Sequence, residues 1–308
     1  MNKTAPPQIN PQRCGTVSLI GAPNAGKSTL VNRLVGTKVS IVTHKVQTTR
    51  SRVVGIAMQD QSQIILVDTP GIFPPQKRLD RAMVSAAWRE AHQSDIIAVL
   101  MDAGRKKRNP AEELLLSELA KRKVPQKIVL ILNKIDLVKR DELLEVAQKF
   151  FKTGLFSEVY MVSALTGDGC DKLLEDFARN VPEGVWRYDP EIVSDMPARL
   201  LAAEVTREKL MQQLHQEIPY MCAVETESWE TDENGRLRIG QIIYATKDRH
   251  KAMILGKRGQ RIKQIGTEAR AELKELLEQD VHLELFVKVK ENWMDDPERY
   301  REWGLDFA

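Results

Sequence analysis

The sequence predicts an α/β domain with a mostly parallel sheet and helices on both faces, followed by a smaller α+β domain. From about Gly15 to Val181, short apolar segments alternate with segments of helical periodicity, which is typical of a sheet covered on both faces. After Pro197 the predicted order becomes helix, strand, strand, helix, helix, strand. A chain of 308 residues is long enough to bury two hydrophobic cores.

The elements of the first domain follow from its apolar patterning. Helices are expected at 111–123, 140–152 and 170–180, and strands at 16–20, 64–67, 128–132 and 159–162. A stretch rich in proline and turn residues then ends at Pro197 and predicts a linker. We therefore divide the chain into a flexible extension (1–13), a first domain (14–182), a linker (183–198), a second domain (199–291) and a tail (292–308). We expect the tail to form a final helix packed on the second domain.

A glycine-rich segment joins the first strand to a helix. It fits the pattern G-x-x-x-x-G-K-[ST] and consists of Gly21, Ala22, Pro23, Asn24, Ala25, Gly26, Lys27, Ser28 and Thr29. Glycines let the backbone approach phosphate groups closely, and a helix N-terminus attracts anions. Lys27 is expected to act in catalysis at the β- and γ-phosphates, and the Ser28 hydroxyl to bind Mg²⁺. The alternative is a strand–helix turn that binds no ligand.

A second motif follows the strand at 64–67 and consists of Asp68, Thr69, Pro70 and Gly71. Its position at the carboxyl end of a strand directs Asp68 towards the nucleotide cleft. Asp68 is expected to hold Mg²⁺, and the Gly71 amide to meet the γ-phosphate during catalysis. The next residues, Ile72 and Phe73, cannot orient an attacking water as glutamine does in Ras-like proteins, so slow intrinsic hydrolysis is predicted.

Two further motifs predict which base is bound. Asn133, Lys134 and Asp136 follow the strand at 128–132, and Ser163 and Ala164 follow the strand at 159–162. We expect a buried Asp136 carboxylate to accept hydrogen bonds from N1–H and N2–H₂ of guanine. Adenine lacks these donors, and a misplaced charged hydrogen bond costs roughly 1.5–3 kcal/mol. The amides near Ser163 are expected to contact guanine O6, so the chain is predicted to select guanine nucleotides.

A polar stretch that starts near His44 and includes residues 47–50, between the first two motifs, is predicted to be a switch segment. One threonine of the segment 47–50 would coordinate Mg²⁺ while the γ-phosphate is present and release it after hydrolysis. We predict Thr49, with Thr48 as the second candidate. Asn24 of the phosphate loop has two interpretations: it either shapes the loop or helps to hold K⁺ against the phosphates.

The second domain carries a basic loop between two predicted helices. Residues 247–274 contain nine Lys or Arg and three Asp or Glu, a local charge of +6 (9 − 3). Such a surface binds nucleic acid in a salt-dependent manner, and a G-x-x-G loop in this element order matches the KH module, which clamps single-stranded RNA. The alternative is a solvated basic helix face. The candidate RNA-binding residues are Ile254, Gly256, Lys257, Arg258, Gly259, Arg261, Ile262 and Lys263.

Composition is compatible with these predictions. The net charge of +3 is small, so a nucleic-acid surface must come from local clustering. Cys14, Cys170 and Cys222 are far apart and have the pattern of reduced thiols rather than of a disulfide or zinc framework. We find neither the apolar core of a signal peptide nor an apolar run of about 20 residues, so a cytoplasmic location is expected.

Taken together, the motifs resemble the bacterial Era family, which consists of TrmE-Era-type GTPases with a C-terminal type II KH domain. The likeness runs from about Gly15 to Trp293. The resemblance implies a GTP-hydrolysing switch that uses Mg²⁺ and acts in assembly of the 30S ribosomal subunit. It implies that the KH domain binds small-subunit ribosomal RNA near its 3′ end and that the GTP state promotes this binding. It also implies weak peripheral contact with the inner face of the cell membrane, and we expect a monomer.

Two alternatives of other classes remain at this point. The protein could be an RNA-binding protein with a vestigial nucleotide site, which nucleotide-binding measurements would test. Alternatively, the basic domain could serve an anionic membrane or a protein partner, which competition between short RNA and lipid vesicles would test.

Overall fold

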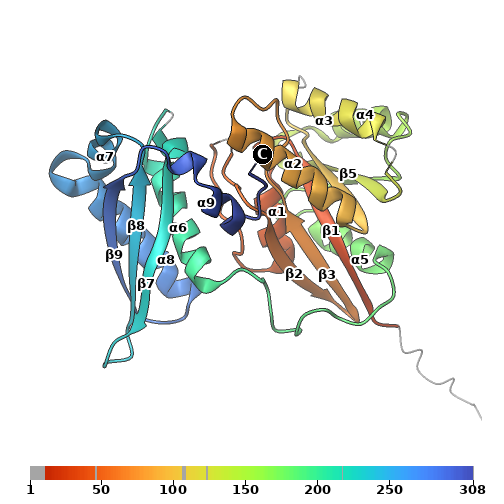
Figure 1. Cartoon of the computed structure of the whole chain (residues 1–308). Helices are drawn as coiled ribbons and strands as arrows, with labels where there is room; N and C mark the ends of the chain where they lie inside the picture. Colours follow the sequence, from red (N-terminus) through yellow and green to blue (C-terminus); the bar gives the residue numbers. More distant parts are fainter. Residues whose placement is uncertain (1–10, 46, 106–108, 123, 217, 308) are drawn as a thin grey trace, which may run out of the picture.

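The computed structural model describes residues 11–45, 47–105, 109–122, 124–216 and 218–307. It contains two domains, each with its own sheet (Figure 1). Most of the predicted N-terminal extension lies outside the described residues, and the first strand begins at Arg13. The predicted fold class, an α/β domain followed by a smaller α+β domain, is confirmed.

The first domain is built on a six-stranded sheet with the order β2-β3-β1-β4-β5-β6. Only β2 is antiparallel to its neighbour, and the remaining pairs are parallel. Strands β3, β4 and β5 are almost continuously buried, as expected for strands covered on both faces. The strands are β1 (Arg13–Gly21), β2 (Val53–Gln59), β3 (Ser62–Asp68), β4 (Ile96–Asp102), β5 (Lys127–Asn133) and β6 (Glu158–Met161).

Helices cover both faces of this sheet. The apolar cluster on one face includes side chains of α1 and α5, and the cluster on the other includes side chains of α2, α3 and α4. Since parallel strands end at the same edge, β1, β3, β4 and β5 bring the residues that follow them together there. The helices are α1 (Lys27–Val35), α2 (Arg78–Gln93), α3 (Pro110–Lys121), α4 (Arg140–Phe151) and α5 (Cys170–Asn180).

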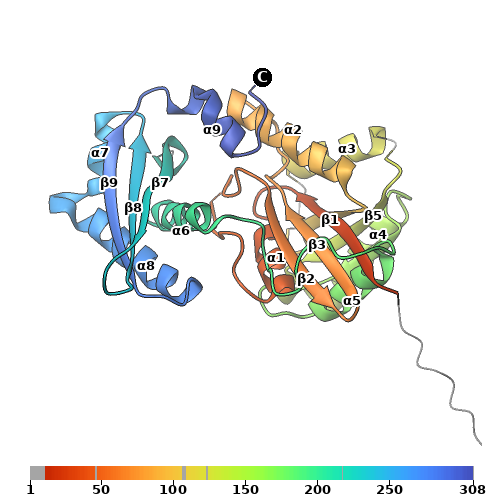
Figure 2. The ribbon, with the colours of Figure 1, turned by 60° about the horizontal axis from the view of Figure 1, so that its bottom comes forward.

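The predicted linker is packed against the first domain. It runs along β2 and β3 before it reaches the second domain (Figure 2). Trp186 and Tyr188 cover apolar side chains of β1, β2 and β3. The amide of Ile56 donates to the carbonyl of Val193 at 2.9 Å, so the segment partly covers the otherwise exposed edge of β2.

The second domain has the predicted order of elements. Its sheet has the order β7-β8-β9, with β7 and β8 antiparallel and β8 and β9 parallel. Two apolar clusters lie between this sheet and the helices α6 and α8. The elements are α6 (Ala198–Gln213), β7 (Cys222–Thr231), β8 (Leu237–Ala245), α7 (Asp248–Leu255), α8 (Gln260–Leu276) and β9 (Val281–Val289).

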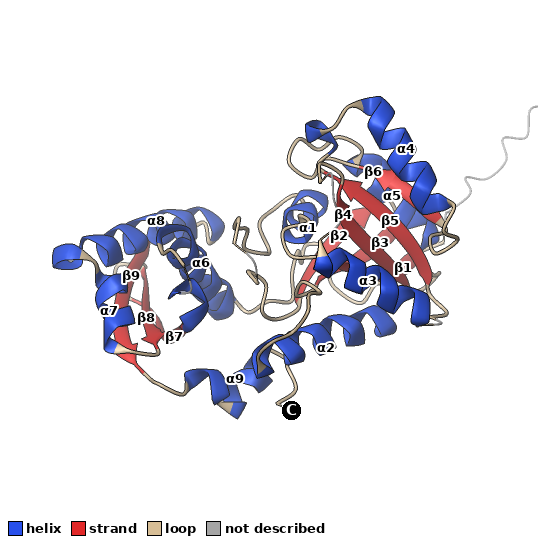
Figure 3. Cartoon of the chain, turned by 90° about the horizontal axis from the view of Figure 1, so that it is seen from above, coloured by secondary structure: helices blue, strands red, loops and turns tan. Residues whose placement is uncertain are grey.

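The tail contacts the second domain, as expected, and it also packs on the first domain, which was not predicted. Its helix α9 (Pro297–Glu302) lies beside α2 of the first domain (Figure 3). Tyr300 and Leu305 join an apolar cluster with Met83 of α2, and the indole of Trp293 donates to the carbonyl of Met221. The tail packs on α2 because the small alanine side chains of this helix leave room for aromatic rings.

None of the helices in the described part of the chain has the length and hydropathy that a membrane-spanning segment requires.

Candidate functional site

The phosphate loop ends at a helix whose first turn lacks a side-chain cap. Gly26 precedes α1 in a left-handed conformation, with φ of 99°, and no acidic residue lies in the first turn of α1. A Cβ atom at Gly26 would lie 2.2 Å from Nδ2 of Asn133. Glycine is therefore required for both the backbone angle and the close approach of β5. The uncapped amides form a surface suited to an anion.

The Lys27 side chain lies within the phosphate loop, where it is predicted to contact the β- and γ-phosphates. Its Nζ donates to the carbonyls of Gly21 and Ala22 at 3.2 and 3.3 Å, and the side chain is buried. Burial lowers the pKa of Lys27, while the nearby charge of Asp68 acts in the opposite direction. Weak neutral acceptors hold this ammonium group, so an anionic oxygen in the loop would be a stronger partner.

Three predicted metal ligands from three separate segments meet beside the loop. Asp68 Oδ2 accepts from Ser28 Oγ at 2.6 Å and from Thr49 Oγ1 at 3.4 Å. Ser28 Oγ and Thr49 Oγ1 lie 3.1 Å apart. Ser40, which no motif indicated, donates to the same carboxylate oxygen at 2.8 Å. Burial raises the pKa of Asp68, and the charge of Lys27 and these three hydroxyls oppose the increase.

This cluster fits a magnesium ion. The second carboxylate oxygen of Asp68, Oδ1, is buried and has no hydrogen-bond partner among the described groups. An unpaired buried carboxylate oxygen is costly unless a ligand compensates it. Mg²⁺ prefers hard oxygen ligands and is commonly held by one carboxylate, hydroxyl groups and phosphate. Ser28, Thr49 and Asp68 supply this chemistry.

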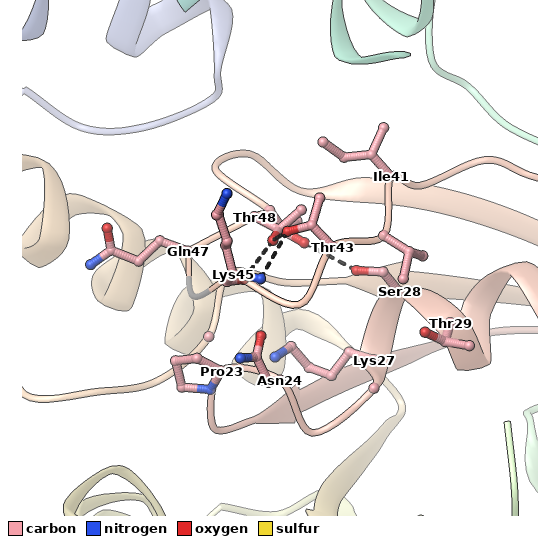
Figure 4. A pocket seen from close by; sticks show the side chains of 14 residues that line it. Pro23, Asn24, Lys27, Ser28, Thr29, Ile41, Thr43, Lys45, Gln47 and Thr48 are labelled. Atoms are coloured by element: carbon pink, nitrogen blue, oxygen red, sulfur yellow. Dashed lines mark hydrogen bonds between the residues drawn. The ribbon is translucent and has the colours of Figure 1, made fainter. Parts of the chain in front are cut away.

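The geometry distinguishes the two threonines of the switch segment. Thr49 is buried and faces Ser28, whereas Thr48 Oγ1 bonds to Thr43 Oγ1 at 2.7 Å and to the carbonyl of Lys45 at 2.8 Å. Figure 4 shows the switch side chains facing the phosphate loop across a pocket. The pocket is lined by Pro23, Asn24, Gly26, Lys27, Ser28, Thr29, Ile41, Val42, Thr43, Lys45, Gln47, Thr48, Thr49 and Gly71.

Asn24 connects the loop to the switch segment. Its Nδ2 donates to the carbonyl of His44 at 2.9 Å, and its φ is 63°. The left-handed backbone conformation and the exposed side chain fit a residue that shapes the turn. The predicted role in holding K⁺ is considered below as a proposal.

Asn133 links the phosphate loop to the segment that follows β6. Its Nδ2 donates to the carbonyl of Ala25 at 2.9 Å, and its Oδ1 accepts from the amide of Ala164 at 3.0 Å. The amide thus ties the end of β5 to the phosphate loop and to the segment after β6. Lys134 has φ of 64° and donates to Asp102 Oδ2 at 2.7 Å, an ion pair for which no motif indicated Asp102.

The prediction that the Asp136 carboxylate is buried is wrong. Asp136 lies in a short 3₁₀ helix, Ile135–Leu137, beyond the end of β5, and it is exposed. Ser163 Oγ nevertheless donates to Asp136 Oδ1 at 2.6 Å and fixes the carboxylate. Sequence alone did not indicate this exposure because motif spacing specifies direction, while burial depends on neighbouring elements.

The segment after β3 turns back into the core. Thr69 Oγ1 donates to the carbonyl of Leu19 at 2.7 Å, and the Ile72 amide donates to the carbonyl of Gly21 at 3.0 Å. Ile72 is fully buried. Gly71 packs against Pro23, since a Cβ atom there would lie 3.0 Å from the proline ring. The position after Gly71 therefore contributes packing and no group that orients water.

The basic loop of the second domain has an unusual backbone. Gly256, Arg258 and Gly259 have φ of 73°, 51° and 74°. A Cβ atom at Gly256 would lie 2.7 Å from Cβ of Arg261. The loop begins α8, whose N-terminus has no side-chain cap and no acidic residue in its first turn. Lys257 and Arg258 are exposed, so the loop presents charge and helix amides to solvent.

Ile254 is the second correction to the predicted site. It is completely buried in the core of the second domain and cannot touch a ligand. The helical periodicity of α7 turns Ile254 towards the sheet, whereas the preceding Met253 is 47% exposed. Arg261 is half-buried and donates to the carbonyl of Met253, and Lys263 is exposed. Ile262 is partly buried against the same core.

Comparisons with known proteins agree with this architecture. Residues 16–134 match the family described as 50S ribosome-binding GTPase, and residues 217–294 match the KH domain. The chain is 54% identical to GTPase Era of Sinorhizobium medicae over 96% of its length and 95% of that protein. It is 56% identical to GTPase Era of Brucella suis over 96% of its length and 94% of that protein.

Solved structures of Era proteins have the same arrangement of both domains. Era of Aquifex aeolicus bound to GDP and AlF₄⁻ has a TM-score of 0.89 and 36% identity, covering 95% of this chain and 99% of that one. Era in complex with MgGDPNP and nucleotides 1506–1542 of 16S ribosomal RNA gives the same values.

The fold and site define a GTPase with a phosphate-loop domain and a C-terminal KH domain. Identity above 50% over almost the entire chain makes the assignment more specific. The chain belongs to the GTPase Era family.

Proposed function

We propose that this protein is a GTP-hydrolysing switch that binds small-subunit ribosomal RNA through its KH domain during maturation of the 30S subunit. The observation that carries the proposal is the convergence of Ser28, Thr49 and Asp68 beside an uncapped helix N-terminus. An oxygen cluster next to an anion-binding loop is what a magnesium–triphosphate site requires.

GTP binding is assigned to the loop and to the motifs after the strands. The phosphates would bind the amides of residues 21–29 and the Lys27 ammonium group, which would exchange its carbonyl partners for charged oxygens. Asp136 would accept the guanine N–H groups, and the bound base would provide the cover that the carboxylate lacks. The remaining assigned residues are Thr69, Pro70, Gly71, Asn133, Lys134, Ser163 and Ala164.

Catalysis would rely mainly on charge and position. Mg²⁺ would be held by Ser28, Thr49 and Asp68, and it would neutralise the charge that develops between the β- and γ-phosphates. Lys27 would stabilise the same charge, and the Gly71 amide would position the γ-phosphate. Because buried Ile72 follows Gly71, no side chain there holds the attacking water, and we expect slow intrinsic hydrolysis.

RNA binding is assigned to the G-x-x-G loop. The glycines would allow close approach of the sugar–phosphate chain, while Lys257, Arg258 and Lys263 would supply positive charge. Support comes from the exposed loop and from the related Era structure that contains a 16S RNA fragment. We propose that the corresponding region of small-subunit ribosomal RNA, near its 3′ end, is the ligand of this protein. Coupling between sites is typically worth 1–3 kcal/mol and is reciprocal, so RNA should tighten GTP binding.

The first experiment measures RNA binding with Mg²⁺ and either GDP or a non-hydrolysable GTP analogue. The wild type should bind a 3′-terminal small-subunit RNA more tightly with the analogue, and Gly256→Asp should lose binding. The matched control is Gly235→Asp, in a turn where φ is 76° and nothing lies within 4 Å of the added Cβ. Equal binding with both nucleotides would remove the coupling, and no binding would favour a protein or membrane partner.

A monovalent cation is a second proposed cofactor. Asn24 Nδ2 faces the switch segment, and the side chain is exposed at the mouth of the pocket, where its oxygen could hold K⁺ against the phosphates. Hydrolysis should then be faster in KCl than in NaCl, and Asn24→Gly, which tolerates the φ of 63°, should remove this difference while leaving GDP affinity unchanged. Equal rates in both salts would reject the cation.

Location and assembly state belong to the same proposal. We propose a cytoplasmic monomer with weak peripheral contact at the inner membrane face. Sedimentation of the purified protein would test the monomer, and flotation with anionic and neutral vesicles would test the membrane contact.

A further inference from the structure

The switch segment of the first domain is held by the second domain on both sides of Thr49. On one side, Arg207 of α6 donates to the carbonyl of Thr48 at 2.6 Å. On the other side, the guanidinium of Arg50 donates to the carbonyls of Cys222 and Tyr220 at 2.8 and 3.2 Å. Thr49 thus lies between the Thr48 carbonyl and the Arg50 side chain, both of which are held by the second domain.

Both arginines are buried, which makes their contacts specific. Arg207 is 3% exposed and Arg50 is 6% exposed. Glu204, one turn earlier on α6, binds Arg207 through two contacts at 2.5 and 2.7 Å and orients the side chain. A buried guanidinium needs several acceptors because desolvation is costly. These two groups therefore have little freedom to move without a rearrangement of the domain contact.

Two tryptophans of the C-terminal tail pack against the Arg50 side chain. The Arg50 guanidinium lies 5.5 Å from the ring centroid of Trp293 and 5.8 Å from that of Trp303. Trp293 is fully buried. The two indoles exclude water from Arg50 and attract its charge. The Thr49 position therefore depends on α6, on the segment 219–222 and on the C-terminal tail.

We propose that Arg50 and Arg207 are positioning residues that hold Thr49 against Ser28 and Asp68, so that the KH domain and tail complete the GTP-specific half of the nucleotide site. This inference rests on the proposed role of Thr49 in binding the metal of the GTP state. Lys38, which precedes the switch segment, also contacts the second domain, since its Nζ lies 2.6 Å from Glu208 Oε2.

The consequence is a selective effect on one nucleotide. Switch threonines contact the metal when the γ-phosphate is present and not with GDP. Loss of either arginine should therefore weaken binding of the GTP analogue and raise the Mg²⁺ concentration needed for it, while GDP affinity stays unchanged. A general loss of stability would instead lower the affinity for the GTP analogue and the affinity for GDP together.

The experiment compares Arg50→Met, Arg207→Met and Thr49→Ala in the full-length protein. Affinities for a GTP analogue and for GDP are measured over a range of Mg²⁺ concentrations. Each arginine variant should lose about tenfold in analogue affinity, the equivalent of one charged hydrogen bond, with GDP affinity within about twofold of the wild type. Arg207→Met combined with Thr49→Ala should be no weaker than Thr49→Ala alone, because both changes act through one side chain.

The matched control is Arg199→Met on the same helix. Arg199 donates to the carbonyls of Thr226 and Glu227 within the second domain, at 3.0 Å each, so the control removes an arginine that makes two exposed main-chain contacts without affecting the switch. Arg50→Lys and Arg207→Lys provide milder variants if the methionine substitutions prevent folding. Each should recover part of the analogue affinity.

The outcomes separate this inference from the proposed function. If Thr49→Ala weakens the analogue but neither arginine variant does, the positioning role is refuted and the GTPase assignment stands. Equal losses for analogue and GDP would also refute it, since they indicate a structural role alone. If the wild type binds both nucleotides and Thr49→Ala binds them equally well, the assigned metal role of Thr49 fails. If the wild type binds neither nucleotide, the proposed function itself fails.

Discussion

At the scale of single residues, the nucleotide site depends on a few positions that allow little substitution. Asn133 connects three segments through one amide, and Asp68 collects three hydroxyl donors on one oxygen. The motifs in the sequence identified both residues by position after a strand. Ser40 and Asp102 could not be identified in this way, because their roles arise only when distant segments fold against the site.

Asp136→Asn is predicted to change base selectivity. An amide presents an N–H donor where the carboxylate offered an acceptor, so it mismatches guanine N2–H₂ and suits the carbonyl at the same position of xanthine. We expect the preference to shift by roughly 100-fold towards xanthine nucleotides. Competition between GTP and XTP would measure it, with Asp141→Asn on the exposed start of α4 as the control. Unchanged guanine selectivity would remove Asp136 from the base site.

Gly26→Ala is predicted to disrupt the phosphate loop. The new Cβ would lie 2.2 Å from Asn133 Nδ2 and break its bond to Ala25, in addition to the strain at φ of 99°. Nucleotide affinity should fall at least about tenfold, since a buried amide would lose its partner. Gly36→Ala is the matched control, because it has φ of 85° but nothing within 4 Å. Titration calorimetry of both variants with GDP would contradict the prediction if their affinities agreed.

At the scale of elements, periodicity predicted most helices and strands, but not β2, α2 and β4, and it did not indicate what the elements pack against. The alternation of apolar and amphipathic segments predicted the doubly covered sheet, because buried strands and helices have distinct periods. It did not predict that Trp186 and Tyr188 of the linker would cover β2 and β3, or that α9 would pack on α2. Aromatic residues in a tail indicate that some surface is buried, but not which surface.

Tyr300→Ala is predicted to release the tail from α2. Tyr300 is 1% exposed, and removing a buried aromatic ring typically costs about 3–5 kcal/mol. Limited proteolysis should then cleave the tail earlier than in the wild type. Urea unfolding should show a free energy of unfolding that is lower by up to about 5 kcal/mol. Phe307→Ala, at a position that is 41% exposed, should change both measurements much less. Equal protection of the tail in wild type and Tyr300→Ala would contradict the docking on α2.

At the scale of the whole molecule, the switch segment is the meeting point of two domains and a tail. Contacts from α6 and from residues 219–222 reach it from one side, and the phosphate loop lies on the other. A change in the nucleotide could therefore reach the RNA-binding loop through packed elements that are already in contact. The reciprocal effect of RNA on GTP affinity is the whole-molecule measurement of this coupling.

Alkaline pH is predicted to destabilise the folded molecule through two buried thiols. Burial raises the pKa of Cys170 to about 11 and that of Cys222 to about 12, from the usual 9.0. Above pH 9 the unfolded chain ionises these thiols while the folded chain keeps them protonated, so stability is complete below pH 9 and falls as pH rises towards 11. Thermal unfolding between pH 8 and 10.5 would measure this, and Cys170→Ala combined with Cys222→Ala should reduce the slope.

The sequence by itself predicted the alternation of strands and helices, the order of elements in the second domain, the phosphate loop, the three strand-end motifs and the basic G-x-x-G loop. These features are local, since each depends on periodicity or on chemistry carried by adjacent residues. Tertiary structure alone decided that Asp136 is exposed and that Ile254 is buried, and it shows that Thr49, the first of two candidates from the sequence, is the threonine that faces Asp68. The same holds for the two arginines around Thr49, because burial and contact are set by segments far apart in the chain.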